Sequence, residues 1–368
     1  MKRFALIFKS WTSVSIALMT GMGMMASYSC TEGPCSNGCE IPEGNTSRLR
    51  IELLSDSGTP DTRSTEAPTA ESDNRINTLD IFIFRNTAPT SKDYQKLDTY
   101  KRFEGSDLDL NNLEITTTTG DKTICVIANS HISDYSSVIN MGVFRTLVSR
   151  LQNEKPGDFT MYGEENSTLG LNSSVSISLE RFVGRIKIAS IKTAFTGPYA
   201  GMNLTDCQLF LINAHGDKLI FNGTATDTPV ILNNGKIVAE DINSTAYNGL
   251  LMDNIAEYID DSGYTVPHYF YCYANETDNI DVATKIVLKA SIDGVEYYYP
   301  IPVNQTNYGY AEANGHYGIR RNTEYSYGIT VTRPGSTDPN EPVVPGSLVL
   351  SILDIKEWEV IPGFEKIF

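Results

Sequence analysis

Leu-Asp-Ile-Phe-Ile-Phe, residues 79–84, and Lys-Thr-Ile-Cys-Val-Ile-Ala, residues 122–128, are the two stretches that decide the fold class. Both are rich in β-branched and aromatic side chains, which favour buried strands. Residues 49–53 and 175–179 alternate apolar with polar side chains, the period of a half-buried strand. The sequence therefore predicts an all-β protein.

Short strands recur along the rest of the chain and are joined by Gly- and Asn-rich turns. They are expected at residues 181–188, 208–213, 269–274, 285–291, 295–303 and 325–332. This spacing is typical of β-sandwiches, and a chain of 368 residues suits two cores once a leader is removed. We place the boundary near Glu180. The best helix candidate is 143–151, where Val143, Leu147 and Leu151 share one face.

The N-terminus has the pattern of an export signal over residues 1–29. A Met-Lys-Arg start precedes a mainly apolar stretch at 11–26, and the small residue Ser29 stands directly before Cys30. We therefore predict that Cys30 is acylated and becomes the new N-terminus, with 30–46 as a linker. Ordinary cleavage or an uncleaved anchor remains the alternative, because Ser27 and Tyr28 depart from the usual lipobox.

Composition argues against several classes of function. The formal net charge is −16, which opposes binding to nucleic acid and to anionic membranes. The sequence has no nucleophile elbow, phosphate loop or zinc helix, so no catalytic residue, metal site or cofactor is expected. Cys30, Cys35 and Cys39 have no histidine nearby, and a tether is the preferred interpretation of that segment.

Two polar segments flank the predicted sandwiches. Residues 57–68 contain two prolines and Arg63, and they are expected to form an exposed loop of the kind that proteases cut. Residues 333–345 hold four prolines and read as a semi-rigid spacer. Apolar strand signals follow at 348–355 and 358–361.

In their order, these landmarks resemble the fimbrillins of type V pili, the surface fimbriae of Bacteroidales-type bacteria. The resemblance extends over most of the mature chain. Its pieces are the first strand with the Arg63 loop, Leu79–Phe84, Thr123–Asn129, Arg181–Lys187, Tyr298–Asn304, Ile319–Tyr325, the spacer with Asp338 and Pro339, and a final strand closing on Glu357 and Trp358.

The resemblance implies two transthyretin-like β-sandwich domains in tandem, at residues 47–180 and 181–333, followed by a spacer and donor strands at 334–368. It also implies export as a lipoprotein that is held at the outer membrane through Cys30. An Arg-specific protease would then cut after Arg63 and leave Ser64 as the N-terminus.

Assembly by donor strand exchange is the implied mechanism. The removable first strand carries Leu49, Ile51 and Leu53, and its loss would empty a groove. The donor candidates in another subunit are Leu348, Leu350, Ile352 and Trp358, because the first three share the spacing of the removable strand. Expected partners are copies of this chain, accessory fimbrial subunits, the protease, and a receptor on a host or bacterial surface.

Three alternatives stay open. Arg63 could simply be a solvated loop charge, as most loop arginines are. The segment 348–355 could close its own domain instead of leaving it. The many tyrosines between 297 and 327 could stack on sugars, which would make the protein a surface glycan-binding lipoprotein or tip adhesin, although ordinary strand aromatics explain them as well.

Overall fold

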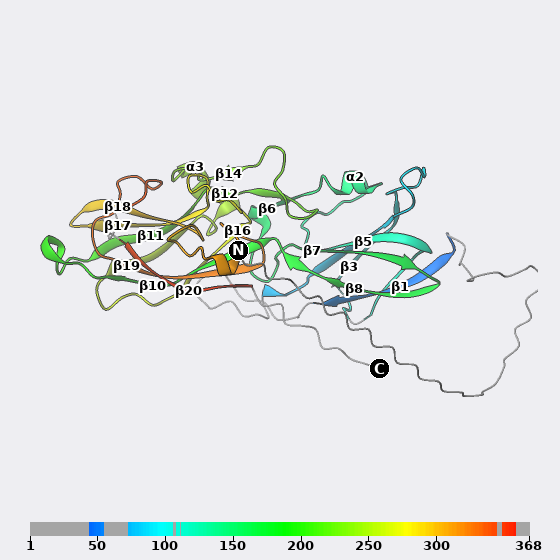
Figure 1. Ribbon diagram of the computed structural model, residues 1–368, viewed down its shortest axis with the longest axis horizontal. Helices are drawn as coiled ribbons and strands as arrows, with labels where there is room; N and C mark the ends of the chain where they lie inside the picture. Colours follow the sequence, from blue (N-terminus) through cyan, green and yellow to red (C-terminus); the bar gives the residue numbers. More distant parts are fainter. Residues whose placement is uncertain (1–43, 55–72, 106–107, 111, 344–347, 358–368) are drawn as a thin grey trace, which may run out of the picture. The chain divides into compact units, whose positions relative to one another are not determined.

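The computed structural model describes residues 44–54, 73–105, 108–110, 112–343 and 348–357, and it is built almost entirely of strands (Figure 1). The prediction of an all-β protein is confirmed. The strands are β1 (Thr46–Leu54), β2 (Thr78–Arg85), β3 (Leu97–Glu104), β4 (Leu113–Thr118), β5 (Gly120–Ala128), β6 (Val148–Arg150), β7 (Met161–Leu169), β8 (Asn172–Ser178), β9 (Glu180–Arg181), β10 (Val183–Thr193), β11 (Leu204–Ile212), β12 (Ala214–His215), β13 (Asp217–Leu219), β14 (Ile231–Leu232), β15 (Met252–Ile259), β16 (His268–Tyr273), β17 (Lys285–Ile292), β18 (Val295–Pro302), β19 (Thr323–Val331) and β20 (Leu348–Glu357).

Helical segments are short. They are the α-helices α2 (Met141–Phe144) and α3 (Ala239–Ile242) and the 3-10 turns η2 (Leu151–Asn153), η3 (Gly197–Tyr199), η4 (Thr245–Tyr247) and η5 (Glu312–Asn314). Within the described residues, no helix combines the length and the apolar character needed to cross a membrane.

Strands β1 to β9 form two main sheets. A three-stranded sheet has the order β4-β1-β8, and a five-stranded sheet has the order β3-β2-β5-β7-β9. Both contribute to one core, here called the N-terminal core, in which Leu49 and Ile51 of β1 join Leu79, Ile81 and Ile83 of β2. Strand β2 is buried on its opposite face too, which explains why its sequence is apolar almost without interruption.

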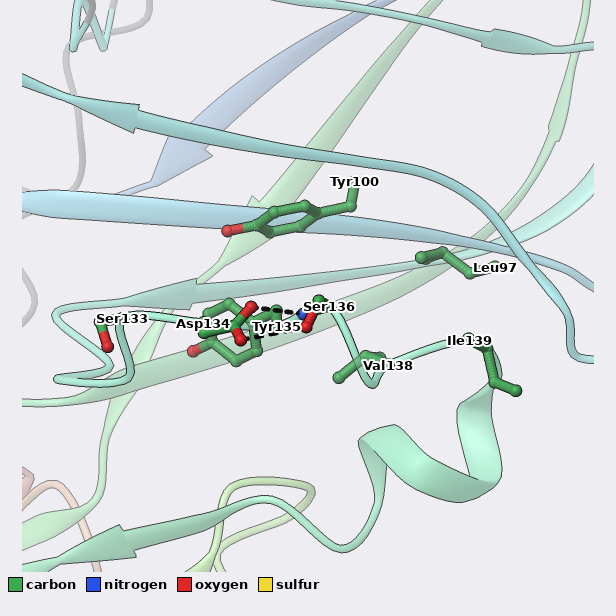
Figure 2. Close-up of a pocket in the computed structure, with 8 residues that line it drawn as sticks. All are labelled: Leu97, Tyr100, Ser133, Asp134, Tyr135, Ser136, Val138 and Ile139. Carbon is green, nitrogen blue, oxygen red and sulfur yellow. Dashed lines mark hydrogen bonds between the residues drawn. The ribbon is translucent and has the colours of Figure 1, made fainter.

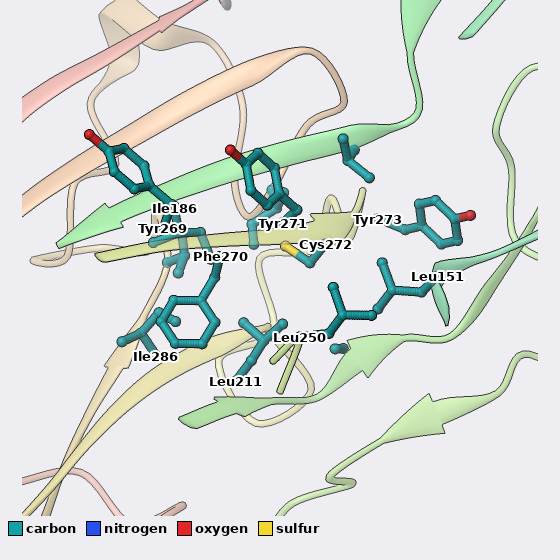
Figure 3. Packing of buried hydrophobic residues seen from close by; sticks show 14 of the residues in the cluster. Leu151, Ile186, Leu211, Leu250, Tyr269, Phe270, Tyr271, Cys272, Tyr273 and Ile286 are labelled. Atoms are coloured by element: carbon teal, nitrogen blue, oxygen red, sulfur yellow. The ribbon is translucent and has the colours of Figure 1, made fainter. Parts of the chain in front are cut away.

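Two four-stranded sheets follow, with the orders β16-β10-β19-β20 and β15-β11-β17-β18. Their shared core is lined by aromatic side chains, and every residue of β16 is buried. Figure 3 shows Phe270 directed toward Ile286, while Tyr269 extends from the other side of the strand. Aromatic and β-branched residues pack well on pleated surfaces, so this region was readily predicted as strand.

Polar contacts join the first sheets to the later ones. Strand β6 pairs with β13, and Asp73, whose side chain is 1% exposed, lies 2.5 Å from the guanidinium of Arg185 on β10. Arg185 Nε also donates to Glu324 on β19 at 2.6 Å. Arg181 adds a hydrogen bond from Nε to the backbone oxygen of Asp73 at 2.9 Å. A buried ion cluster therefore fixes the chain directly after residues 55–72 onto the later sheet.

The expected helix at 143–151 is wrong. Helix α2 spans only Met141–Phe144, its N-terminus capped by the side chain of Asn140, and residues 148–150 form strand β6 instead. Pairing with β13 overrides a weak apolar spacing, because tertiary hydrogen bonds outweigh a small local propensity. Strands β3, β7 and β15 were not expected, since their exposed faces carry polar residues that dilute the strand signal.

We predict that replacing Arg185 with Ala lowers the free energy of unfolding by about 3–5 kcal/mol, because Asp73 and Glu324 would remain buried without their counter-charge. Arg320→Ala is the matched control. Its partner Glu276 lies 3.1 Å away with both side chains nearly half exposed, so the loss should stay below about 1 kcal/mol. Urea unfolding of both variants measures the difference, and equal losses would contradict a structural role for the buried cluster.

Candidate functional site: the groove filled by strand β1

Strand β1 occupies the centre of the three-stranded sheet. It pairs antiparallel with β4, Leu49 opposite Ile115, and parallel with β8, Leu49 opposite Ser173. Figure 1 shows β1 and β8 side by side. A central strand bonds through its backbone on both edges, so removal of β1 would leave β4 and β8 each with an open edge.

The side chains of β1 alternate as the sequence predicts. Leu49 is 0% exposed and Ile51 is 1% exposed, whereas Leu53 is partly buried against the N-terminal core. Arg48 and Arg50 face solvent. Burial of three such apolar side chains contributes ~1.5–3 kcal/mol each, a large share of the ~5–15 kcal/mol that stabilises a typical domain.

Ser47 is an unfavourable residue within this strand. It is 0% exposed, and among the described residues its hydroxyl has no hydrogen-bond partner. A buried hydroxyl without a partner costs about 1–3 kcal/mol. Strand β1 therefore fills its groove without being the best sequence for it.

The other end of the expected exchange is also visible. Strand β20 pairs antiparallel with β19, with Leu348 opposite Val331 and Ile352 opposite Tyr327. It lies at the outer edge of its sheet, and Leu350 is partly buried against the core of the later sheets. A strand thus forms at the predicted donor segment, and it pairs with this chain's own sheet, as the alternative of a closing strand expects. Its role as a donor stays a prediction.

Four predicted site residues lie outside the described part of the chain. They are Cys30, Arg63, Ser64 and Trp358. The positions of these four residues relative to the groove are therefore not described, and their roles remain predictions. The Asp73 anchor, which sequence reasoning missed, gives no local signal because its partners lie more than 100 residues away.

The buried cysteines and His268 lie among core residues or bond to neighbouring side chains. Burial raises the pKa values of Cys125, Cys207 and Cys272 to about 12, so these thiols stay protonated. His268 is 2% exposed and its Nδ1 lies 2.6 Å from Asp253. In the described ranges, no cluster of three or more His, Cys, Asp or Glu residues is arranged to hold a metal ion.

Most of the tyrosines proposed as sugar platforms belong to the core. Tyr299, Tyr325 and Tyr327 are fully buried. Tyr310 and Tyr317 stack on each other with ring centroids 3.6 Å apart. Strand packing accounts for the three buried rings, whereas Tyr310 and Tyr317 lie in the loop between β18 and β19.

One pocket of about 500 Å³ lies elsewhere, between β3 and the loop after β5 (Figure 2). The ring of Tyr100, 36% exposed, faces that loop, and its hydroxyl donates to Asp80 at 2.8 Å. On the loop, Asp134 already accepts hydrogen bonds from the backbone nitrogen and the hydroxyl of Ser136. The ring of Tyr135 also lines the pocket but is only 5% exposed, so a sugar would meet one exposed ring here.

Comparison with known proteins places these features in context. Residues 47–186 match the family model described as major fimbrial subunit protein (FimA). A putative cell adhesion protein from Parabacteroides distasonis has a similar structure, with TM-score 0.62, 19% identity and coverage of 87% of this chain and 98% of that chain. A fimbrilin from Porphyromonas gingivalis gives TM-score 0.60 and 16% identity, covering 87% and 99%. A search among curated proteins gave no match.

We predict that Leu49→Ala in the uncut chain lowers the free energy of unfolding by ~2–5 kcal/mol, because it opens a cavity in the N-terminal core. Arg48→Ala, on the exposed face of the same strand, should change it by no more than about 0.5 kcal/mol. Chemical denaturation of both variants measures the effect. If the two variants were equally stable, β1 would not contribute to the core and could not leave a groove worth refilling.

Proposed function

We propose that the protein is a fimbrial subunit of the FimA family, whose model matches residues 47–186, and so a structural protein and not an enzyme. We further propose that it polymerises by exchanging β1 for a strand of another subunit. The observation that carries the proposal is the position of β1 at the centre of its sheet, with Leu49 and Ile51 inserted in a core. A groove that loses such a strand exposes apolar surface and two backbone edges at once. Both are costly in water, so the emptied groove favours the binding of a new strand.

The order of events follows from the connectivity of the chain. The precursor is exported as a lipoprotein and tethered to the outer membrane through Cys30. A cut after Arg63 separates the lipid anchor and β1 together from the rest of the chain, since both precede the cut. The mature subunit then begins at Ser64 and is free to leave the surface of the membrane for the fimbria.

The donor gains backbone partners when it moves. Among the described strands of its own chain, β20 is an edge strand whose ladder runs to β19. In an emptied groove of a neighbour it would lie between β4 and β8 and form two ladders. Its ten residues are enough for a site that β1 fills with nine. Main-chain hydrogen bonds would supply affinity, and alternate side chains would set the register.

The proposed organisation of the precursor has two sandwich domains, at 47–180 and 181–333, with the spacer and donor segment at 334–368. Its partners are other copies of itself and accessory fimbrial subunits. Adhesion would follow from display on the cell surface and a receptor on a host or bacterial cell.

We predict that Arg63→Ala prevents assembly, because β1 stays covalently attached and the groove stays filled. The precursor is treated with an arginine-specific protease, the new N-terminus is sequenced, and fibres are sought by electron microscopy. Arg48→Ala is the control, since it removes an arginine from β1 but keeps the loop, and it should release Ser64 and form fibres. Normal fibres from the Arg63 variant would show that another cleavage site or another trigger operates.

We further predict that deletion of residues 348–368 leaves a folded subunit that accepts a strand but cannot lend one. After cleavage it should form no fibres alone and should shorten fibres of the full-length chain when mixed with it, because it ends each chain that it joins. Thermal unfolding and electron microscopy measure both effects. Loss of a cooperative melt would show that β20 is needed by its own sheet, and unchanged fibre lengths in the mixture would show that the groove does not accept a strand.

A further inference from the structure

The backbone pairing of strand β4 depends on β1, so an exchange of β1 would disturb it. Among the strands that the structure describes, its backbone ladder runs to β1 alone. If β1 leaves, β4 would be expected to lose its position, and the groove would close before a donor arrives. An acceptor that must be rebuilt at each encounter would bind slowly and weakly, because ordering the wall costs free energy at the moment of binding.

A second set of contacts holds β4 from its other side. On the neighbouring strand β3, the hydroxyl of Thr99 donates to the backbone oxygen of Thr116 at 3.3 Å. The ammonium of Lys101 donates to the backbone oxygen of Glu114 at 3.0 Å. Side chains of β3 thus take the place of a ladder along the outer edge of β4.

Asp98 makes the third and strongest contact. Its carboxylate accepts from the backbone nitrogen of Thr118 at 3.0 Å and from the hydroxyls of Thr117 and Thr118 at 2.7 Å. The side chain is 2% exposed, and Arg85 at 2.9 Å and Lys122 at 3.3 Å neutralise it. Burial alone would raise the pKa of Asp98, but the bonds from Thr118 and Thr117 and the charge of Lys122 hold the pKa well below its usual value.

The spacing of these contacts shows that they do not depend on β1. They engage backbone groups of residues 114, 116 and 118, every second position of β4. In a strand, the N–H and C=O of one residue point to the same edge, and successive residues alternate between edges. The backbone groups of residues 113, 115 and 117 therefore point to the edge occupied by β1, and the β3 contacts lie on the opposite edge.

The facing wall is also fixed without β1. Strand β8 follows β7 after a tight turn in which the backbone nitrogen of Gly170 donates to the hydroxyl of Ser173 at 2.9 Å. Farther along, β8 passes so close to Gly163 of β7 that a Cβ there would lie 2.2 Å from the backbone oxygen of Ser178. Only glycine permits this approach.

We propose that Asp98, Thr99 and Lys101 are positioning residues that hold β4 in place when β1 has gone, so that the groove is a preformed acceptor for a donor strand. This inference rests on the proposed function. It gives β3 a role in the acceptor subunit, and it makes no claim about the subunit that donates the strand. Preformed walls speed association and strengthen binding because little order is lost on binding.

The test uses the double variant Thr99→Val and Lys101→Met, which keeps the size of both side chains and removes their hydrogen bonds to β4. The control is the double variant Thr123→Val and Lys289→Met, which removes a hydroxyl bonded to Asn166 and an ammonium bonded to Glu296, both away from β4. Asp98 is left intact, because Arg85 and Lys122 would lose their counter-charge and the chain could fail to fold.

Each full-length chain is cut with an arginine-specific protease and mixed with an excess of a fluorescent synthetic peptide of residues 346–368. Fluorescence anisotropy then gives the rate and extent of uptake. Wild type and control should take up the peptide alike, and the β3 variant should do so about tenfold more weakly, as the loss of two hydrogen bonds implies. Before cleavage all three should melt at similar temperatures, since β1 still holds β4.

Separate results overturn separate claims. No uptake by cut wild type would refute strand exchange itself. Uptake by wild type together with equal uptake by the β3 variant would refute the positioning role alone. A lower melting temperature of the uncut β3 variant, relative to the control, would show that these bonds stabilise the whole fold and are no special support of the emptied groove.

Discussion

Backbone pairing on both edges of β1 is the constraint on which the N-terminal region depends. Strand β1 supplies the ladder for β4 and for β8, and its apolar face completes the core formed with β2 and β5. In the described part of the chain, neither β4 nor β8 has another ladder neighbour within that sheet. The slot for β1 must therefore be filled by some strand, although nothing in its geometry requires that strand to come from the same chain.

In the proposed exchange, covalent attachment would decide which strand fills the slot. While residues 55–72 connect β1 to the rest of the chain, its effective concentration at the groove is high, and an external strand of equal intrinsic affinity cannot compete. A cut in that segment makes β1 a separate ligand that can diffuse away. The unsatisfied hydroxyl of Ser47 then counts against it, since a donor with an apolar or bonded residue at that position avoids the cost. Arg181 and Arg185 bind Asp73, and after the proposed cut these contacts would keep the chain from residue 73 onward in place while β1 leaves.

Sequence patterns predicted the parts of this fold that bury apolar surface in a regular period. Strands β1, β2, β5 and β16 were predicted because alternation or aromatic content is strong in each of them. Strand β3 was missed, although it carries Asp98, because its burial is mixed and its key bonds reach β4 and β5 across the fold. The alternation of β20 was recognised, but a pattern of period two says only that one face is buried and not which sheet receives it.

If the proposed exchange operates, the number of backbone ladders explains why cleavage would set its direction. Among the described strands of the uncut chain, β1 has two ladder neighbours and β20 has one. In an exchanged polymer, the groove again has two ladders, but β19 has lost its pairing with β20. Main-chain bonds alone therefore do not favour the polymer over the uncut precursor. Against a cut subunit whose groove is empty, the same exchange gains a ladder and buries the exposed core. Under the proposed mechanism, assembly would therefore be favourable only after proteolysis, and the uncut chain would keep all its strands in place.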